Sequence, residues 1–118
     1  MVKSIVIVLT KSPYGSVATV GGLMSALATS SHGVKTTIVF MDDAILSLTK
    51  NQRPDVIRMA SVQGLVKAMA NVRLAVHLQS LEERGLTEDN LMSDVKLELL
   101  ETGELAKLVA EADVTFTL

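Results

Sequence analysis

The chain has 118 residues and a formal net charge of −2 at pH 7, which is the size of one domain. The slight acidic excess and an aromatic content of 3% argue against nucleic-acid binding and membrane-surface binding, which require basic patches or stacking platforms. The absence of cysteine excludes disulfides, thiolate metal sites and sulfur chemistry on this chain's own side chains. We recognise neither a signal peptide nor a membrane span, and therefore expect a cytoplasmic protein.

Apolar runs predict five strands with helical segments between them. The expected strands cover about 3–10, 35–41, 72–77, 95–100 and 114–118, and the expected helices lie near 16–31, 43–48, 61–70, 78–84 and 102–112. The first two strands are almost continuously apolar, as in a sheet covered on both faces, whereas the fourth alternates as an edge strand does. This alternation of strands and helices predicts one α/β domain over residues 1–118, with a five-stranded, mainly parallel sheet and helices on both faces.

The first expected helix is unusual because residues 12–34 contain no Asp, Glu, Lys or Arg. At helical spacing, one apolar face is expected to pack on the sheet: Val17, Val20, Met24, Leu27 and Ala28. The other faces carry small uncharged residues: Ala18, Thr19, Gly22, Ser25, Ala26 and Thr29. A surface helix of a soluble monomer normally carries charge on its outer side, so we expect these small residues to contact another subunit.

Several residues predict where helices begin and end. Ser16 and Ser61 can cap the first and third helices, and Gly33 and Gly85 can end the first and fourth. Thr102, with an acidic residue two positions later, favours the start of the last helix. The buried face of that helix is expected to contain Leu105, Leu108, Val109 and Ala112.

Ligands of open parallel sheets bind at the carboxyl ends of the strands, and polar residues follow three of the expected strands. The loop at 10–16 leads into a helix whose free N–H groups can hold an anion. It matches neither a Walker A motif nor a dinucleotide fingerprint, so it is either a tight turn or a pocket for a ligand or partner. Its candidate pocket residues are Lys11, Ser12, Tyr14, Gly15 and Ser16.

The second and third loops contribute Asp42, Asp43 and His77 to the candidate pocket. One aspartate is expected to cap the short helix that follows, although both could approach a cation or a basic residue of a partner. His77 is expected to be a structural, hydrogen-bonded histidine, with a role as acid, base or ligand as the alternative. We predict no metal site, since His77 or His32 would have to converge on the two aspartates and these two histidines are scattered along the chain. We also predict no catalysis by this chain alone.

In order and spacing, several segments resemble the DsrE/DsrF/TusC family of small sulfur-relay proteins, most closely its TusC/DsrF branch. The segments are IVIV at 5–8, SPYGS at 12–16, LATS at 27–30, VFMDDA at 39–44, QRPD at 52–55, SLEERGL at 80–86 and ADVTF at 112–116. The resemblance spans essentially the whole chain. It implies a flavodoxin-like fold, no cofactor, and assembly into trimers or hexamers, either of one chain or with DsrE/TusD-like subunits.

The resemblance also implies where sulfur chemistry would occur. Sulfur-carrying members of the family hold a persulfide on a cysteine at the end of a central strand, before a helix that ends in Arg-Gly. Counting back from Arg84 and Gly85, that position is His77. Imidazole cannot carry a sulfane sulfur, so either His77 replaces the cysteine in a structural subunit or it assists a persulfide on a partner.

The leading interpretation is therefore a cysteine-free accessory subunit of a sulfur-transfer oligomer, for tRNA thiolation or sulfur oxidation. An alternative is a homo-oligomeric module that binds a small anion at the loop 10–16. A third is a histidine-dependent enzyme that uses His77 with Asp42 or Asp43.

Overall fold

The computed structural model describes residues 2–11, 18–49, 62–69 and 71–118, without the side chains of 18 and 62–64. The expectations for Ser12, Tyr14, Gly15, Ser16 and Val17, and for the cap at Ser61, therefore lie outside the described residues. Among the described helices, none is long and apolar enough to cross a bilayer.

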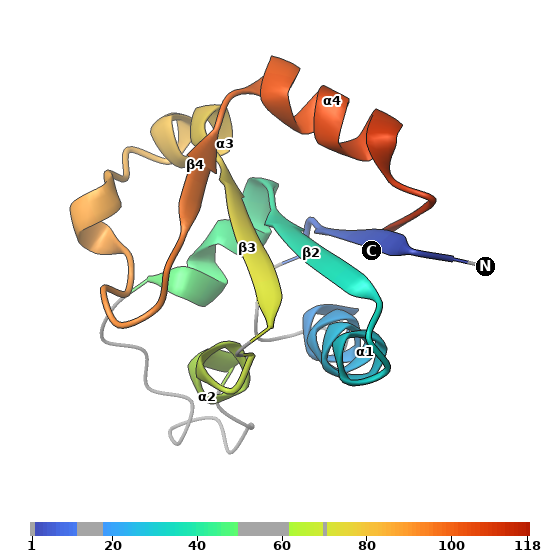
Figure 1. Cartoon of the computed structure of the whole chain (residues 1–118). Helices are drawn as coiled ribbons and strands as arrows, with labels where there is room; N and C mark the ends of the chain where they lie inside the picture. Colours follow the sequence, from blue (N-terminus) through green and yellow to red (C-terminus); the bar gives the residue numbers. More distant parts are fainter. Residues whose placement is uncertain (1, 12–17, 50–61, 70) are drawn as a thin grey trace.

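Five strands form one sheet in the order β4-β3-β2-β1-β5 (Figure 1). The strands are β1 (Ser4–Leu9), β2 (Lys35–Phe40), β3 (Val72–His77), β4 (Glu98–Leu100) and β5 (Val114–Thr117). Every neighbouring pair is parallel. The chain proceeds from β1 to the β4 edge and then returns, so that β5 lies on the other side of β1. The predicted α/β fold is confirmed.

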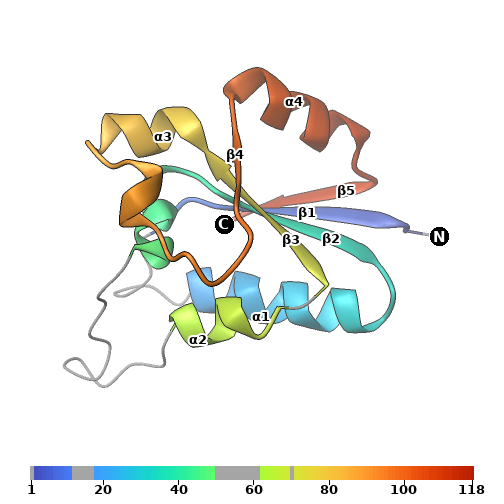
Figure 2. The ribbon, with the colours of Figure 1, turned by 60° about the vertical axis from the view of Figure 1, so that its left-hand side comes forward.

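Helices cover both faces of the sheet, as Figure 2 shows. One face packs against α1 (Ala18–Ser31) and α2 (Val62–Lys67), and the other against α4 (Thr102–Glu111), with α3 (Leu78–Glu83) beside it. The larger core lies on the α1 side and includes Ile7, Phe40 and Leu74, whereas the smaller core lies beneath α4. β1 and β2 are buried on both faces, which explains why their sequences are nearly continuous in apolar residues.

The predicted orientation of α1 was wrong. Thr19, Gly22, Leu23 and Ala26 are buried against the sheet, while Met24 is 57% exposed. Leu27 and Ala28 are likewise exposed rather than packed on the sheet, and Val20 is half-buried. Small residues occupy the buried face because the helix lies close to β1. A Cβ built on Gly22 would come within 2.5 Å of Leu9 Cδ2.

This rotation removes three residues from the predicted subunit interface. Thr19, Gly22 and Ala26 are buried within the subunit and are not available to a neighbour. Of the other interface candidates, Ser25 is exposed and Thr29 is half-buried, with its hydroxyl 2.8 Å from that of Thr36. The side chain of Ala18 lies outside the described residues.

Other element boundaries match less closely. β4 begins at Glu98 rather than at 95, although Val95 and Leu97 still pack against the larger core. The short second helix is a 3-10 helix, η1 (Asp42–Leu48), and a further 3-10 turn, η3 (Glu88–Asn90), was not predicted. In α4, Leu105 is buried, whereas Val109 is 36% exposed and does not belong to the buried face.

The predicted glycine stops are confirmed, since Gly33 has φ +80° and Gly85 has φ +66° after their helices. α4 begins at Thr102, as predicted. Its N-cap is Glu101, and Glu101 and Glu104 form a reciprocal capping box.

Candidate functional site

The carboxyl ends of β2 and β3 bring three of the candidate residues, Asp42, Asp43 and His77, into one region. His77 is the last residue of β3 and is 7% exposed. Its Nδ1 lies 2.6 Å from Ser80 Oγ on α3, and its Nε2 lies 2.7 Å from Thr102 Oγ1 at the start of α4. One imidazole ring therefore joins a strand to two helices, as expected for a structural histidine.

The surrounding hydrogen bonds assign the tautomer of His77. Thr102 Oγ1 donates to Gln79 Oε1 at 3.2 Å, so the threonine oxygen accepts from His77 Nε2–H. Nδ1 then accepts the hydroxyl hydrogen of Ser80. Ser80 Oγ in turn accepts from the backbone N–H of Asp42 at 3.1 Å. Every ring nitrogen and hydroxyl in this chain of bonds has a partner in the Nε2–H tautomer.

The two aspartates contribute to this region, but not in the predicted way. The residue at the N-cap of η1 is Met41, without a side-chain cap, so the prediction that an aspartate caps this helix was wrong. Asp42 adopts φ +49°, and its backbone N–H, rather than its carboxylate, binds Ser80. Asp43 pairs instead with a cation of the same subunit, Arg84, at 3.1 Å. Arg84 also donates to the Ser80 carbonyl at 3.1 Å.

These contacts leave His77 without a carboxylate partner. Its two ring nitrogens bind hydroxyls, and neither aspartate side chain is hydrogen-bonded to it in the described part of the chain. The described residues also contain no cluster of three His, Cys, Asp or Glu side chains that could hold a metal ion. Within the described residues, His77 is therefore not hydrogen-bonded to Asp42 or Asp43, the pairing on which the histidine-dependent hypothesis rests.

A cavity of about 440 Å³ opens beside the His77–Thr102 hydrogen bond. It is lined by Leu78, Gln79, Glu82, Glu101, Thr102 and Gly103. Two of these residues are acidic, so the opening disfavours an anionic group near His77. Sequence reasoning did not identify Ser80 and Thr102 as partners of His77. Ser80 lies three residues along the chain and could have been found from its spacing, but Thr102 depends on the packing of α4.

Of the loop 10–16, the structure describes Thr10 and Lys11. Thr10 is tied to the end of the chain, since its N–H and its hydroxyl both donate to the Leu118 carbonyl, at 2.9 and 2.6 Å. Lys11 is exposed, and its carbonyl accepts from the Thr19 hydroxyl at 3.0 Å. The anion-binding prediction for this loop stays a prediction.

Comparison with known proteins identifies the family. The model of the DsrE/DsrF-like family matches residues 3–118. The chain belongs to this family.

Two relatives span the same length as the chain. It is 25% identical to the intracellular sulfur oxidation protein DsrF of Allochromatium vinosum, over 99% of this chain and 97% of that protein. It is 28% identical to a TusC homologue of Pseudomonas aeruginosa, over 100% of both chains.

Solved structures agree on the fold. The crystal structure of the ychN protein of E. coli matches with a TM-score of 0.86 at 24% identity, over 98% of this chain and 99% of that one. A protein of unknown function from Methanobacterium thermoautotrophicum matches with a TM-score of 0.68 at 14% identity, over 98% of both chains. At these identities the two structures support the fold alone.

Proposed function

We propose that this member of the DsrE/DsrF-like family is an accessory subunit of a sulfur-transfer assembly, for tRNA thiolation or sulfur oxidation, and carries no sulfur itself. The observation that supports this most directly is His77. At the position where the family resemblance places a persulfide cysteine, the chain has a buried imidazole with both nitrogens hydrogen-bonded. A partner subunit would supply the acceptor thiol, because this chain has no cysteine.

The alternative role for His77, assistance to a partner's persulfide, receives less support. A nitrogen that is committed to Ser80 or Thr102 must break that bond before it can serve an external group. The cavity beside it presents Glu82 and Glu101, whose charges oppose a persulfide anion. His77 therefore acts as a structural residue of the subunit.

The proposed contacts with neighbouring subunits lie on the outer side of α1 and on β5. Large apolar side chains are exposed there: Met24, Leu27, Phe116 and Leu118. Neither α1 nor residues 114–118 contain a charged residue. β5 is an edge strand, and the unpaired backbone groups of an uncharged, apolar edge can pair with a strand of another chain. A cavity of about 320 Å³ between α1 and β5 extends this apolar surface. A homologous subunit with a similarly uncharged surface is the partner that fits it.

The test is reconstitution with a cysteine-bearing subunit of the same family that copurifies from the native host. We expect a stoichiometric complex in which mass spectrometry finds the persulfide on the partner alone. His77→Gln should leave assembly intact and change the rate of sulfur transfer by less than about fivefold, because a positioning hydrogen bond is worth about 1 kcal/mol.

Thr102→Val is the matched control, since it removes the same hydrogen bond and keeps the imidazole. A tenfold loss of transfer in His77→Gln alone, with assembly intact, would show that the imidazole takes part in the chemistry. Failure to find any family partner in the complex would reject the accessory role.

A further inference from the structure

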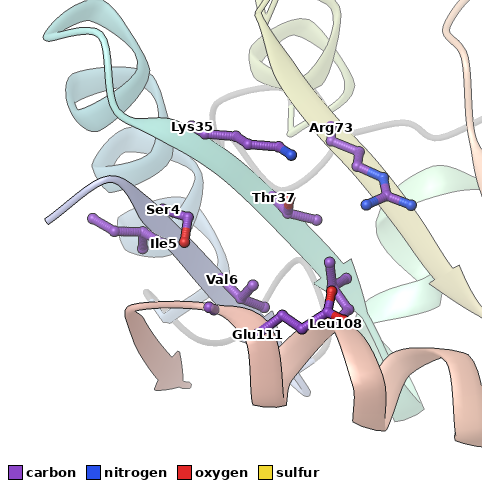
Figure 3. A pocket seen from close by; sticks show the side chains of 9 residues that line it. Ser4, Ile5, Val6, Lys35, Thr37, Arg73, Leu108 and Glu111 are labelled. Atoms are coloured by element: carbon purple, nitrogen blue, oxygen red, sulfur yellow. The ribbon is translucent and has the colours of Figure 1, made fainter.

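A second cavity, of about 200 Å³, lies at the opposite end of the sheet from His77, between the sheet and the last turns of α4. Figure 3 shows Lys35 and Thr37 of β2 beside Arg73 of β3, with Glu111 of α4 on the opposite wall. The remaining lining residues are Ser4, Ile5, Val6, Leu108 and Ala112. This cavity contains neither His77 nor the residues of α1 and β5 that are proposed to contact other subunits.

The parallel register brings the polar side chains of three strands together. Ser4 lies opposite Lys35, and Thr37 lies opposite Arg73. Lys35 and Thr37 are two residues apart on one strand and point to the same face of the sheet. Neighbouring strands are separated by only about 5 Å, so an ammonium, two hydroxyls and a guanidinium surround one small volume.

Thr37 is the residue that points most directly to a ligand. It is 3% exposed, and its hydroxyl makes no hydrogen bond to any residue that the structure describes. The hydroxyl is not cut off from solvent, since Ser47 Oγ is the only buried side-chain oxygen or nitrogen without a partner among the described residues. It therefore reaches solvent through the cavity and can donate to an acceptor bound there. Because Thr37 lines the cavity, a molecule in the cavity can supply that acceptor.

The other polar groups also offer donors. Lys35 forms no ion pair within the described part of the chain. Arg73 binds Glu98 through Nε at 2.5 Å and Nη2 at 2.9 Å, which fixes the guanidinium and leaves Nη1 for another acceptor. Ser4 Oγ accepts from the Asp113 N–H at 3.1 Å, so its own hydroxyl hydrogen remains to be donated.

We infer that this cavity binds a small oxyanion, held by Lys35, Arg73, Thr37 and Ser4. All four groups donate hydrogen bonds and two are cationic, which is the chemistry that recognises a phosphate or a carboxylate. The volume admits only a few heavy atoms beyond the anionic group. Glu111 on the opposite wall disfavours a ligand with a second negative group at its far end.

The experiment is a titration of the intact chain with inorganic phosphate and, separately, with acetate, followed by amide NMR shifts at constant ionic strength. We expect saturable shifts at residues 35–37, 73 and 108–112 with phosphate, acetate or both. The anion that saturates identifies the class of ligand. An absence of saturable shifts with both anions up to 50 mM, or shifts confined to other parts of the chain, would overturn the inference.

Three single substitutions make the test specific, because they change the affinity in different directions. Lys35→Gln should weaken binding at least about fivefold, since it removes a charge-assisted donor. Glu98→Gln releases the guanidinium of Arg73 and should strengthen binding about two- to fivefold. Lys96→Gln removes the same charge as Lys35→Gln from an exposed position outside the cavity and should leave the affinity within about twofold.

If Lys35→Gln and Lys96→Gln lowered the affinity for the anion equally, only the net charge of the protein would matter. That result would overturn the inference of a specific site. The wild-type shift map needs no variant, so it decides the question even if one variant folds poorly. This result is independent of subunit assembly, and so it can fail while the accessory role stands.

Discussion

His77 connects β3, α3 and α4 through the hydroxyls of Ser80 and Thr102. The side-chain amide of Gln79 determines which atom donates and which accepts in these hydrogen bonds. Gln79 accepts from Thr102, which makes Thr102 the acceptor for Nε2–H. His77 and Ser80 are buried, whereas Gln79 and Thr102 are exposed. The buried members stabilise the fold only while they are hydrogen-bonded, because an unpartnered buried group costs the desolvation of its polar atom.

Thr102→Val should therefore lower the free energy of unfolding by about 1–2 kcal/mol, because Nε2–H of His77 loses its acceptor. Thr102→Ser keeps the hydroxyl and should recover most of this loss. Urea denaturation of both variants provides the measurement. In a double-mutant cycle with His77→Gln, we expect a coupling of about 0.5–3 kcal/mol, and additive effects would contradict the hydrogen bond.

At the level of whole elements, α1 packs on β1 through Gly22. A Cβ at this position would meet Leu9 Cδ2 at 2.5 Å and Leu118 Cδ1 at 3.0 Å. Gly21, on the exposed side of the same helix, has no atom within 4 Å of its built Cβ. Two adjacent glycines thus differ in the one respect that matters for substitution, the space available for a methyl group.

Gly22→Ala should destabilise the protein by about 1–3 kcal/mol, since the overpacked helix must move away from β1. Gly21→Ala should instead stabilise it by about 0.5–1 kcal/mol, because alanine is the better helix former and has room. Thermal unfolding of the two variants tests this directly. A similar change in melting temperature for both would show that α1 does not approach β1 so closely.

The same helix shows how far sequence reasoning reaches. Its length and its end at Gly33 were predictable, because they depend on local signals. Its orientation was not, because α1 is apolar or small on every side and periodicity favoured the larger residues. Close packing instead selected Thr19, Gly22 and Ala26, which can approach the strand backbone.

The candidate site divides in a similar way. The position of His77 at a strand end followed from the order of elements. The bond to Thr102 depends on two segments that are 25 residues apart. The bond from the Asp42 N–H to Ser80 likewise joins residues 38 positions apart, across the contact between η1 and α3, so no local pattern revealed it.

β3 and β4 are joined by an ion pair that makes stability depend on pH. The hydrogen bond from Arg73 holds the pKa of Glu98 below its ordinary 4.5, against the opposing effect of burial and with further help from the charges of Arg73 and Lys96. A carboxyl whose pKa is lower in the folded state stabilises the protein above its unfolded pKa. That stabilisation is lost as the pH falls through the folded pKa.

The wild type should lose unfolding free energy between pH 7 and pH 3, and Glu98→Gln should lose about 0.5–1 kcal/mol less over the same range. The effect is small because the pair is partly exposed and solvent screens it. Urea titrations at the two pH values measure the difference. Glu83→Gln is the control, since Glu83 is exposed and in no ion pair among the described residues. An equal effect of both substitutions would exclude a specific role of the pair.

For the molecule as a whole, the distribution of charge separates two surfaces. Acidic residues are concentrated in the second half of the chain, where η3 and the segment around α4 carry Glu88, Asp89, Glu101, Glu104 and Glu111. The outer side of α1 and β5 carries apolar side chains and no charge, and Met24 and Phe116 are more than half exposed. Contiguous exposed apolar surface is typical of sites where a protein contacts another protein.

We therefore expect Met24→Glu and Phe116→Lys each to shift the protein from an oligomer to a monomer in size-exclusion chromatography with light scattering, because a charge buried in an apolar interface is strongly unfavourable. Val109→Lys is the matched control. Val109 is also apolar and exposed, but it lies on α4, on the opposite face of the sheet. The control should keep the oligomer. If Val109→Lys dissociates the oligomer while Met24→Glu and Phe116→Lys do not, the subunits contact each other through α4. The uncharged side of α1 is then not the subunit interface.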